Sequence, residues 1–409
     1  MPSKNKQLVR YLESRLARLV REKKSFLLLG PRQVGKTTLV RSLLASRENV
    51  LEYTLQDPSV RITLEQDPSR IIREARAHGV RPLVFIDEAQ KVPELFDATQ
   101  VLLDNREASC IFTGSSARKL RRAGANLLPG RIQRLFLDPL LWGELGLMRH
   151  PALSEFALKN INAHGSYSFE DLLIYGSLPL MVSLTPNERK DILKSYAQLY
   201  LEEEIRAEAI VRKIGAFSRF LELAAVESGT APNLSKLSQE SGVSQPSIKE
   251  FYQILEDTLV VERIDPYLKN ARKRILASSR YYFFDLGVRN ALARIPLERD
   301  VINTQKGTLF EHAVILEIIR RNRLLQKPHT IHYWRTSGGA EVDCVVDTGS
   351  SVIPIEIKAG KSVRLSEIKG LRIFLEEYRR VAPVGYVITQ GERRERLDER
   401  ITAVPWFDL

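Results

Sequence analysis

The feature that most constrains this chain is a nine-residue segment at positions 30–38, GPRQVGKTT. It has the pattern G-x-x-x-x-G-K-T of a loop that cradles phosphate groups. The apolar run at 26–29 predicts a buried strand before it, and the stretch at 37–44 predicts a helix after it. In that setting backbone N–H groups converge on the phosphates, and the helix N-terminus adds partial positive charge. The segment therefore predicts a nucleoside triphosphate site rather than an ordinary glycine-bearing turn.

Two side chains of this loop have a predicted task of their own. Lys36 can reach the β- and γ-phosphates of ATP, and the Thr37 hydroxyl can hold Mg²⁺. The other contacts are expected from the loop backbone and the first turn of the helix. The residues predicted to bind the nucleotide here are Gly30, Pro31, Arg32, Gln33, Val34, Gly35, Lys36, Thr37 and Thr38.

A second apolar run, at 83–86, ends in two acids, Asp87 and Glu88. Parallel α/β sheets carry their chemistry at the carboxyl ends of the strands. Asp87 is suited to bind Mg²⁺, directly or through water. Glu88 is suited to polarise the water that attacks the γ-phosphate. The competing interpretation is a surface acid pair that only ends a strand.

A third apolar run, at 110–112, is followed by small hydroxyl residues, and we expect its strand to lie between the first two. Thr113 and Ser115 are then candidate sensors of the γ-phosphate. Arg131, in the turn sequence LPGRI, is a candidate for stabilising transition-state charge in the site of a neighbouring subunit. The alternative for Arg131 is a surface arginine without a catalytic role.

Composition narrows the class of protein and of partner. A chain of 409 residues predicts two to four domains, and its formal charge of +12 favours an anionic partner, nucleic acid before membrane. Cys110 and Cys344 lie in apolar runs, which predicts two buried thiols instead of a disulfide. The histidines have no zinc-ligand spacing, and no apolar run approaches membrane-spanning length. We therefore expect a cytoplasmic protein without a membrane partner.

The middle of the chain has a helix-turn-helix pattern at 234–255. The first helix should end at Gly242 and Ser244 should cap the second, while the stretch 259–264 predicts the first strand of a wing. In a DNA reader, residues early in the second helix, Gln245, Ser247 and Lys249, would face the groove. A helical packing module with the same geometry is an equal alternative.

Basic residues after this motif favour phosphate contacts, although a solvated charged face would have the same composition. They are Lys269, Arg272, Lys273, Arg274 and Arg280, and a second basic set that could serve the same purpose is Arg118, Arg121 and Arg122.

The last hundred residues predict a helix at 310–322, strands at 331–335, 341–346 and 352–358, a helix at 365–379 and a strand at 385–388. Glu356 and Lys358 are two residues apart on one strand, so they share a face. If Asp343 lies on the adjoining strand, both carboxylates and the Ile357 carbonyl could bind Mg²⁺, with Glu311 completing the site. Lys358 would hold the attacking water or stabilise the developing charge.

This arrangement of helix, strands, Asp343, Glu356 and Lys358 resembles the restriction-endonuclease-like nuclease core, PD-(D/E)xK, which Holliday junction resolvases also share. The resemblance implies metal-dependent cleavage of DNA, with Asp343 and Glu356 as metal ligands and Glu311 and Lys358 as catalytic residues. The alternative is a domain that keeps this fold for binding after losing catalysis.

The earlier motifs carry a second resemblance. GPRQVGKTT, LVFIDEAQK, FTGSS, LPGR and DPLLWGEL resemble the AAA-type ATPases of bacteria and archaea that have a C-terminal domain of unknown function. The similarity continues through YGSLP, ILEDTL, FFDLGV and YWRT and so covers nearly the whole chain. It implies Walker A, Walker B and sensor roles for the first three motifs and a tendency to form rings.

We therefore expect an α/β protein with three parts: an AAA-type P-loop ATPase at 1–146, a helical and winged-helix-like region at 147–305, and a nuclease-like domain at 306–409. The predicted function is ATP-dependent action on duplex or branched DNA by a homo-oligomer, with ATP and Mg²⁺ as cofactors. The rival hypothesis is a regulatory ATP switch that binds protein partners and uses the nuclease-like domain as a scaffold.

Overall fold

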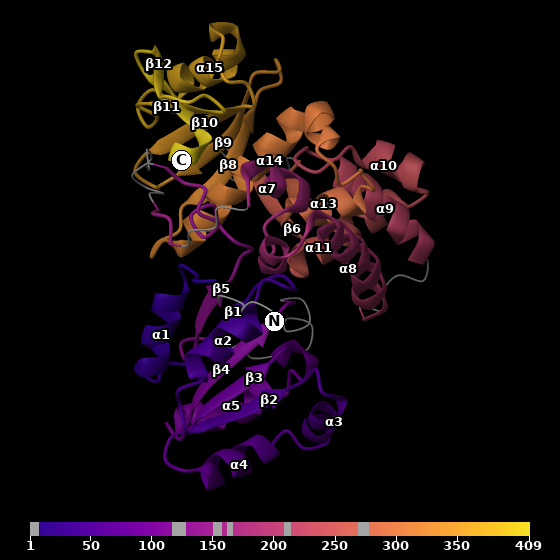
Figure 1. Ribbon diagram of the computed structural model, residues 1–409, viewed down its shortest axis with the longest axis vertical. Coiled ribbons are helices and arrows are strands. Elements are labelled where there is room, and N and C mark those ends of the chain that lie inside the picture. The colour runs from indigo at the N-terminus through magenta and orange to yellow at the C-terminus, as the bar shows by residue number, and fades with distance from the viewer. Residues whose placement is uncertain (1–7, 117–127, 150–157, 162–166, 208–213, 269–277) are drawn as a thin grey trace. The chain divides into compact units, whose positions relative to one another are not determined.

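The fold of the chain is shown in Figure 1 as a computed structural model. The structure describes residues 8–116, 128–149, 158–161, 167–207, 214–268 and 278–409. The chain divides into two compact units, one formed by Val9–Pro139 with Gln253–Val260 and one formed chiefly by Leu140–Tyr252 and Val261–Leu409. The second unit contains residues of both the predicted middle region and the predicted C-terminal domain, so the three-part division stays a prediction.

The first unit is built on a parallel sheet in the order β2-β3-β4-β1-β5. Its strands are β1 (Phe26–Leu29), β2 (Val50–Thr54), β3 (Leu83–Asp87), β4 (Ser109–Gly114) and β5 (Gln133–Phe136). The three apolar runs of the sequence form β1, β3 and β4, and β4 lies between the other two as expected. The carboxyl ends of these strands therefore carry the phosphate loop, the acid pair and the predicted sensor to one edge of the sheet.

Helices cover this sheet: α1 (Glu13–Arg21), α2 (Lys36–Leu44), α3 (Pro58–Gln66), α4 (Arg70–His78) and α5 (Leu95–Asp104). Alternate residues of a strand point to opposite faces. Leu27 and Val84 belong to a core that includes Phe96 of α5, while their chain neighbours Phe26 and Phe85 are fully buried as well. Both faces of the sheet are thus covered, which explains why its central strands are continuous apolar runs.

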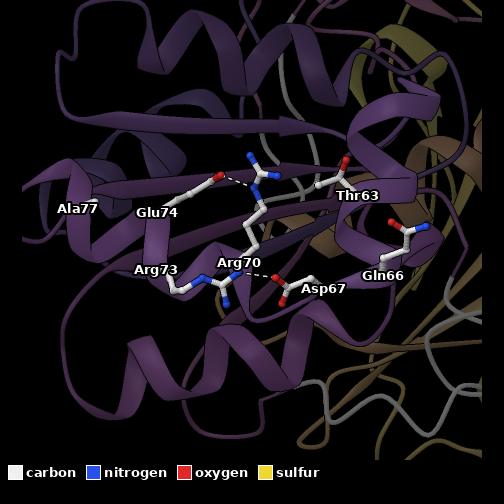
Figure 2. Close-up of a pocket in the computed structure, with 7 residues that line it drawn as sticks. All are labelled: Thr63, Gln66, Asp67, Arg70, Arg73, Glu74 and Ala77. Atoms are coloured by element: carbon white, nitrogen blue, oxygen red, sulfur yellow. Dashed lines mark hydrogen bonds and ion pairs between the residues drawn. The ribbon is translucent and has the colours of Figure 1, made fainter.

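An open hollow of about 530 Å³ lies on α3 and α4. Its lining consists of Thr63, Gln66, Asp67, Arg70, Arg73, Glu74 and Ala77 (Figure 2). Arg70 is paired with Glu74 and Arg73 with Asp67, so both guanidinium groups are neutralised by neighbouring carboxylates. These helices carry none of the residues predicted to bind the nucleotide.

The second unit has helices both before and between the strands of its sheet. They are α7 (Phe169–Tyr175), α8 (Pro186–Ala207), α9 (Ile214–Val226), α10 (Leu234–Ser241), α11 (Gln245–Asp257), α13 (Leu286–Leu292), α14 (Asp300–Leu324) and α15 (Lys369–Glu377). Figure 1 labels these helices in the second unit.

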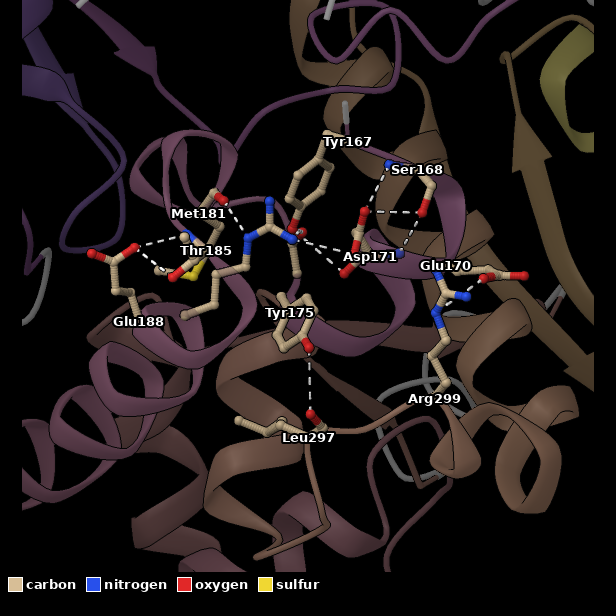
Figure 3. A network of polar contacts seen from close by, with 12 residues as sticks. Tyr167, Ser168, Glu170, Asp171, Tyr175, Met181, Thr185, Glu188, Leu297 and Arg299 are labelled. Carbon is tan, nitrogen blue, oxygen red and sulfur yellow. Dashed lines mark hydrogen bonds and ion pairs between the residues drawn. The ribbon is translucent and has the colours of Figure 1, made fainter. Parts of the chain in front are cut away.

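A polar network fixes the start of this helical region (Figure 3). Ser168 and Asp171 form a reciprocal capping box at the N-terminus of α7. The buried Arg189 of α8 donates to the Met181 carbonyl at 2.7 Å and to Asp171 at 3.2 Å, and its guanidinium lies over the Tyr167 ring. Because the guanidinium pairs with the Asp171 carboxylate, it ties α8 to α7 without leaving a buried charge unpaired.

The predicted helix-turn-helix is present as α10 and α11. Gly242 ends α10 with a φ of 69°, a left-handed conformation that favours glycine. The Phe251 ring of α11 packs edge-on against the Phe217 ring of α9, with 4.7 Å between the ring centroids. Gln245 and Lys249 remain exposed on α11. This geometry suits both a DNA reader and a packing module.

The strands of the second unit form a mixed sheet in the order β12-β13-β11-β10-β9-β8-β6-β7 among the residues described. They are β6 (Val261–Pro266), β7 (Arg280–Phe283), β8 (Thr330–Arg335), β9 (Glu341–Asp347), β10 (Val352–Lys358), β11 (Gly385–Thr389), β12 (Glu395–Asp398) and β13 (Ile401–Pro405). The predicted wing strand, β6, pairs with β7 on one side and with β8 on the other. The hairpin after the helix-turn-helix therefore continues the C-terminal sheet, an arrangement that the sequence did not predict.

Two helix boundaries in the C-terminal part differ from their predictions. The helix expected at 310–322 is part of the longer α14, which is interrupted at Gln305. The one expected at 365–379 begins as a 3₁₀ turn, Leu365–Ile368, before α15.

Two smaller expectations can be compared directly with the structure. Cys110 and Cys344 are both buried and free, as the sequence predicted. In the part of the chain that the structure describes, no helix is long and apolar enough to cross a membrane.

Candidate functional site: a phosphate loop and a buried acid cluster

Two positions in the phosphate loop of the first unit require glycine. A Cβ atom added to Gly30 would lie 2.2 Å from the Leu137 carbonyl oxygen, and the Gly30 N–H donates to the Gly114 carbonyl at 3.2 Å. Gly35 has a φ of 90° immediately before α2. The loop is therefore held against the carboxyl end of β4 and turns directly into a helix N-terminus, which is the geometry of an anion site.

The side chain of Lys36 is hydrogen-bonded to the backbone of the loop itself. Lys36 donates to the carbonyl oxygens of Gly30 at 2.9 Å and Pro31 at 2.8 Å. Burial lowers the pKa of Lys36 to about 8. If phosphate oxygens replaced those carbonyl oxygens as acceptors, the ammonium group would have a negatively charged partner.

The other predicted loop residues are distributed between core and surface. Val34 is fully buried, whereas Gln33 and Thr38 are exposed and Arg32 is partly buried. Gln33 has a φ of 63°, which a non-glycine residue adopts only where the surrounding chain imposes it.

Arg10 is a residue of this site that sequence reasoning missed. Its guanidinium donates to the Val34 carbonyl at 2.9 Å and to the Asp138 carbonyl at 2.6 Å. Arg10 is only 6% exposed, and its two hydrogen bonds link the phosphate loop to the segment after β5. A lone arginine before a helix gives no sequence signal for such a role.

Two of the predicted hydroxyl residues, Thr37 and Thr113, converge on Asp87. Thr37 Oγ1 donates to Asp87 Oδ1 at 2.7 Å, and Thr113 Oγ1 donates to the same oxygen at 2.6 Å. The Glu88 N–H donates in turn to Thr113 Oγ1 at 3.0 Å. Thr37 and Asp87 therefore present two neighbouring oxygens, the ligand type that Mg²⁺ prefers. The structure brings the first, second and third motifs together at one point.

Glu88 is held by the residues around it. Its backbone is left-handed, with φ 59° and ψ 46°. Its Oε2 atom accepts from Ser115 Oγ at 2.9 Å and also from Gln90 Nε2. Gln90 was not among the predicted site residues, although it is the glutamine of the DEAQ sequence, two residues after Glu88.

Arg131 lies at the surface of the same unit. Its guanidinium is paired with Asp104 of α5, with 3.2 Å between Nη2 and Oδ2. Within one chain Arg131 thus has an acidic partner at the surface, and its role toward a neighbouring subunit stays a prediction.

The second unit brings the predicted nuclease residues together. Asp343 on β9 and Glu356 on β10 lie on adjacent antiparallel strands and are 8% and 6% exposed. Asp343 Oδ2 accepts from the Ile357 N–H at 2.8 Å. Lys358 Nζ lies 2.7 Å from Glu356 Oε1, so these two residues share one face of β10, as expected.

Strand β7 adds side chains that the sequence did not predict. The Tyr282 hydroxyl donates to Glu311 Oε1 at 3.0 Å. Arg280 Nη1 lies 3.8 Å from the same oxygen, and Arg280 is also hydrogen-bonded to Glu341. We call Glu311, Glu341, Asp343 and Glu356 the acid cluster. Its cations are Arg280, Lys358 and Arg335, the last 3.6 Å from Glu341, so four carboxylates face three cations and the formal charge is negative.

This arrangement corrects the expectation for Arg280, which is only 6% exposed and therefore does not contribute to an exposed phosphate-binding surface. The other basic residues predicted for that purpose lie outside the described residues: Lys269, Arg272, Lys273, Arg274, Arg118, Arg121 and Arg122.

Burial makes three carboxylates of the acid cluster, those of Glu311, Asp343 and Glu356, unusually basic. Burial, reinforced by the charge of Asp343, raises the pKa of Glu356 to about 8 and that of Glu311 to about 7. Burial also raises the pKa of Asp343. Crowded, desolvated carboxylates of this kind are concentrated at functional sites.

One atom of the cluster is left without a partner. Glu356 Oε2 is buried and accepts no hydrogen bond in the structure. An orphan acceptor beside a second carboxylate fits a divalent cation. Among the described residues, no group of three or more His, Cys, Asp or Glu side chains is placed to hold a metal ion. A cation here would therefore rest on Asp343, Glu356 and a backbone carbonyl, with water as the remaining ligands.

Comparison with protein families agrees with the first site. Residues 22–146 match the family described as AAA domain. This part of the chain is therefore similar to AAA-type ATPase domains. Residues 166–299 and 306–409 match two families that are each described as a domain of unknown function, DUF8612 and DUF4143. The family models thus support ATP hydrolysis and assign no activity to the acid cluster.

Two relatives are similar over almost the whole chain. They are the uncharacterized protein Rv2008c of Mycobacterium tuberculosis and the uncharacterized protein Mb2031c of Mycobacterium bovis. Each is 26% identical over 399 residues, which is 96% of this chain and 82% of the relative.

Among solved structures, the Walker-type ATPase PABY2304 of Pyrococcus abyssi is similar with a TM-score of 0.48 and 16% identity, over 71% of this chain and 97% of that one. The replication initiator DnaA bound to AMPPCP and single-stranded DNA is similar with a TM-score of 0.31 and 14% identity, over 61% of this chain and 90% of that one.

Proposed function

We propose that this protein is an ATP-dependent enzyme that acts on DNA and cuts it with its C-terminal domain in the presence of a divalent metal. The observation that carries the proposal is the pairing of Asp343 and Glu356 on adjacent strands, with Lys358 hydrogen-bonded to Glu356 and one carboxylate oxygen of Glu356 left without a partner. Two carboxylates and a lysine at one point supply the groups that phosphodiester hydrolysis needs.

In the first unit, the residues divide the work of ATP hydrolysis. Lys36 and the loop backbone bind the phosphates, and Thr37 with Asp87 holds Mg²⁺. Glu88 takes a proton from the attacking water, and Thr113 and Ser115 sense the γ-phosphate. Arg131 acts on the nucleotide of a neighbouring subunit in a homo-oligomeric ring, where it exchanges its pairing with Asp104 for the γ-phosphate.

In the second unit, Asp343, Glu356 and the Ile357 carbonyl would hold a second Mg²⁺. When bound, the metal polarises the scissile phosphate and offsets its developing negative charge. Lys358 orients the attacking water next to Glu356. Glu311, which lies on α14, offsets the positive charge of Arg280. The cluster has four carboxylates and three cations, and this excess negative charge favours a divalent ion.

DNA is the proposed substrate because of charge and local geometry. The formal charge of the chain is +12, and the exposed Gln245 and Lys249 lie early in the second helix of the helix-turn-helix, with the half-buried Ser247 between them. A hairpin of β6 and β7 follows, as a wing follows such a motif, and its strand β7 reaches the acid cluster. A protein of this kind would work in the cytoplasm.

The proposal is tested with end-labelled duplex, single-stranded and branched DNA, in Mg²⁺ or Mn²⁺, with and without ATP. Asp343→Asn and Glu356→Gln should reduce cleavage by about 10²-fold or more, since the metal loses one of two carboxylates. Lys358→Ala should bind metal and DNA and cut slowly. ATP hydrolysis should survive all three changes, because the phosphate loop belongs to the other unit.

Asp347→Asn is the matched control, because Asp347 ends the same strand and its carboxylate caps the Gly349 N–H outside the acid cluster. It should cut DNA at the parent's rate. Failure of the parent to cut any DNA form with either metal, or full cleavage by Asp343→Asn, would make this a binding domain.

The rival function is an ATP switch for protein partners, for which the acid cluster is a structural remnant. DNA-stimulated ATP hydrolysis separates the two, because a switch directed at proteins has no reason to respond to DNA. Stimulation supports the proposal, and an ATPase rate that no form of DNA changes supports the switch.

A further inference from the structure

We propose that Gln90 is a positioning residue for ATP hydrolysis, which holds the carboxylate of Glu88 in the orientation that the attacking water requires. Gln90 lies in the short 3₁₀ turn Ala89–Lys91, which follows Glu88 and the strand that ends at Asp87. The inference rests on the ATPase part of the proposed function and adds a residue to which no role has been assigned.

The hydrogen bonds around Glu88 form a closed set of three groups. Gln90 Nε2 donates to Glu88 Oε2 and also to Ser115 Oγ, at 3.0 Å for the latter. Ser115 Oγ–H donates to the same Glu88 oxygen at 2.9 Å. Glu88 Oε2 therefore receives two donors, which fixes the carboxylate plane and leaves Oε1 as the oxygen that can accept a proton from water.

The amide of Gln90 can be oriented in one way only. Its Nε2 faces two oxygens that accept hydrogen bonds, and the opposite orientation would place Oε1 against a carboxylate. Gln90 is 5% exposed, and its Oε1 is buried with no hydrogen-bond partner. A buried acceptor without a partner costs free energy, so packing alone would favour an apolar side chain at this position.

The surroundings of Gln90 are shaped to admit this amide. A Cβ atom added to Gly114 at the end of β4 would lie 3.1 Å from Gln90 Oε1 and 3.3 Å from Leu29 Cδ2. Gly114 in turn accepts from the Gly30 N–H, so the amide lies against the residue that anchors the phosphate loop. A polar group retained at a stability cost, beside the predicted general base, is typical of a site kept for function.

Gln90→Leu tests the inference, because leucine is close in size and cannot donate to Glu88. We expect kcat for ATP to fall by about tenfold to a hundredfold, which is part of the contribution of a well-placed general base. The Kd for ATP should stay within about twofold of the parent value, because Lys36 and the loop are untouched. Gln66→Leu, the same change at an exposed glutamine of α3, is the control and should match the parent.

A second variant separates positioning from a structural role. In Gln90→Glu, the introduced carboxyl repels Glu88 when ionised and can donate to it when protonated. Its activity relative to the parent should therefore rise as the assay is taken from about pH 8.5 to about pH 6. The relative activity of Gln90→Leu should stay flat over the same range. Thermal melting of each variant shows whether the domain is folded.

The outcomes are distinct. A parent-like kcat for a folded Gln90→Leu, or a higher one, overturns the inference, as does a flat pH response of Gln90→Glu. A lower kcat with unchanged ATP affinity and the pH rescue supports it. The ATPase proposal is judged separately by the parent and Lys36→Ala: if the parent hydrolyses no ATP, the proposed function fails first.

Discussion

The two candidate sites differ in how their carboxylates are satisfied. At the nucleotide site, Asp87 and Glu88 each accept two hydrogen bonds from hydroxyl or amide groups. In the acid cluster, burial raises the pKa of Glu356 to about 8, and one oxygen of that residue has no partner. The carboxylates of the nucleotide site are already held by hydrogen bonds without a ligand. In the acid cluster, ionised carboxylates are destabilised by burial and mutual repulsion, and a bound cation would reduce that destabilisation.

This difference suggests different uses of binding energy. A preorganised carboxylate requires little rearrangement when the nucleotide binds, so it mainly lowers the barrier of the hydrolysis step. A crowded set of carboxylates gains most of its stabilisation when the metal binds, because the metal removes the repulsion and the desolvation cost together. Variants of the first site should mainly lose activity, and variants of the second should also change stability.

The largest effect is expected at the nucleotide site. Glu88→Gln should leave ATP bound and slow hydrolysis by up to about 10⁴-fold, since the amide cannot act as a base. Lys36→Ala should instead weaken ATP binding, because it removes the charge that faces the phosphates. Binding of a fluorescent ATP analogue and release of phosphate measure the two separately. Normal hydrolysis by Glu88→Gln would remove the role given to that residue.

A somewhat smaller loss is expected for Arg131, and it tests whether one chain holds a complete nucleotide site. Arg131→Ala should bind ATP and hydrolyse it about 10³-fold more slowly, if the guanidinium acts on a neighbouring subunit. Mixing this variant with Glu88→Gln should restore part of the activity, because hybrid interfaces join an intact arginine to an intact base. A fully active monomer at every concentration would contradict the prediction.

The sequence predicted the nucleotide site far better than its supporting residues. The phosphate loop is a continuous sequence motif. Asp87 and Thr113 follow strands that are neighbours in the sheet, so they lie close to the loop. Arg10 could not be predicted, because its contacts depend on the close approach of distant chain segments. Gln90 lies only two residues after Glu88, but its contact with Ser115 depends on the neighbouring strand β4.

The acid cluster was predicted in part, for a similar reason. Alternation along β10 places Glu356 and Lys358 on one face, which the sequence alone implies. The contribution of Arg280 and Tyr282 depends on β7, a strand of four residues that joins the C-terminal sheet through β6. Pairing between strands so distant in the chain has no local signal, and Arg280 was therefore assigned to a surface that it does not occupy.

The smallest effect, on stability, separates the two sites most clearly. The pKa of Glu356 is about 8 in the folded protein and about 4.5 in an unconstrained chain. Because the folded value is the higher one, the group favours unfolding above pH 4.5, and its penalty is complete only above pH 8. Glu356→Gln removes the charge and should stabilise the metal-free protein by about 1–2 kcal/mol near pH 8.5, with little gain near pH 5. The loss of its ion pair with Lys358 keeps the gain below the full cost of burial.

Thermal melting without divalent metal, at both pH values, measures this difference. Glu392→Gln, at an exposed glutamate of the same sheet region, is the control and should leave the melting temperature unchanged at either pH. Adding Mn²⁺ should then raise the melting temperature of the parent more than that of Glu356→Gln, because only the parent offers both carboxylates to the ion. If Glu356→Gln instead melts at a lower temperature than the parent at the higher pH, the Glu356 carboxylate stabilises the fold through its ion pair with Lys358. The proposed difference between the two sites would then be wrong.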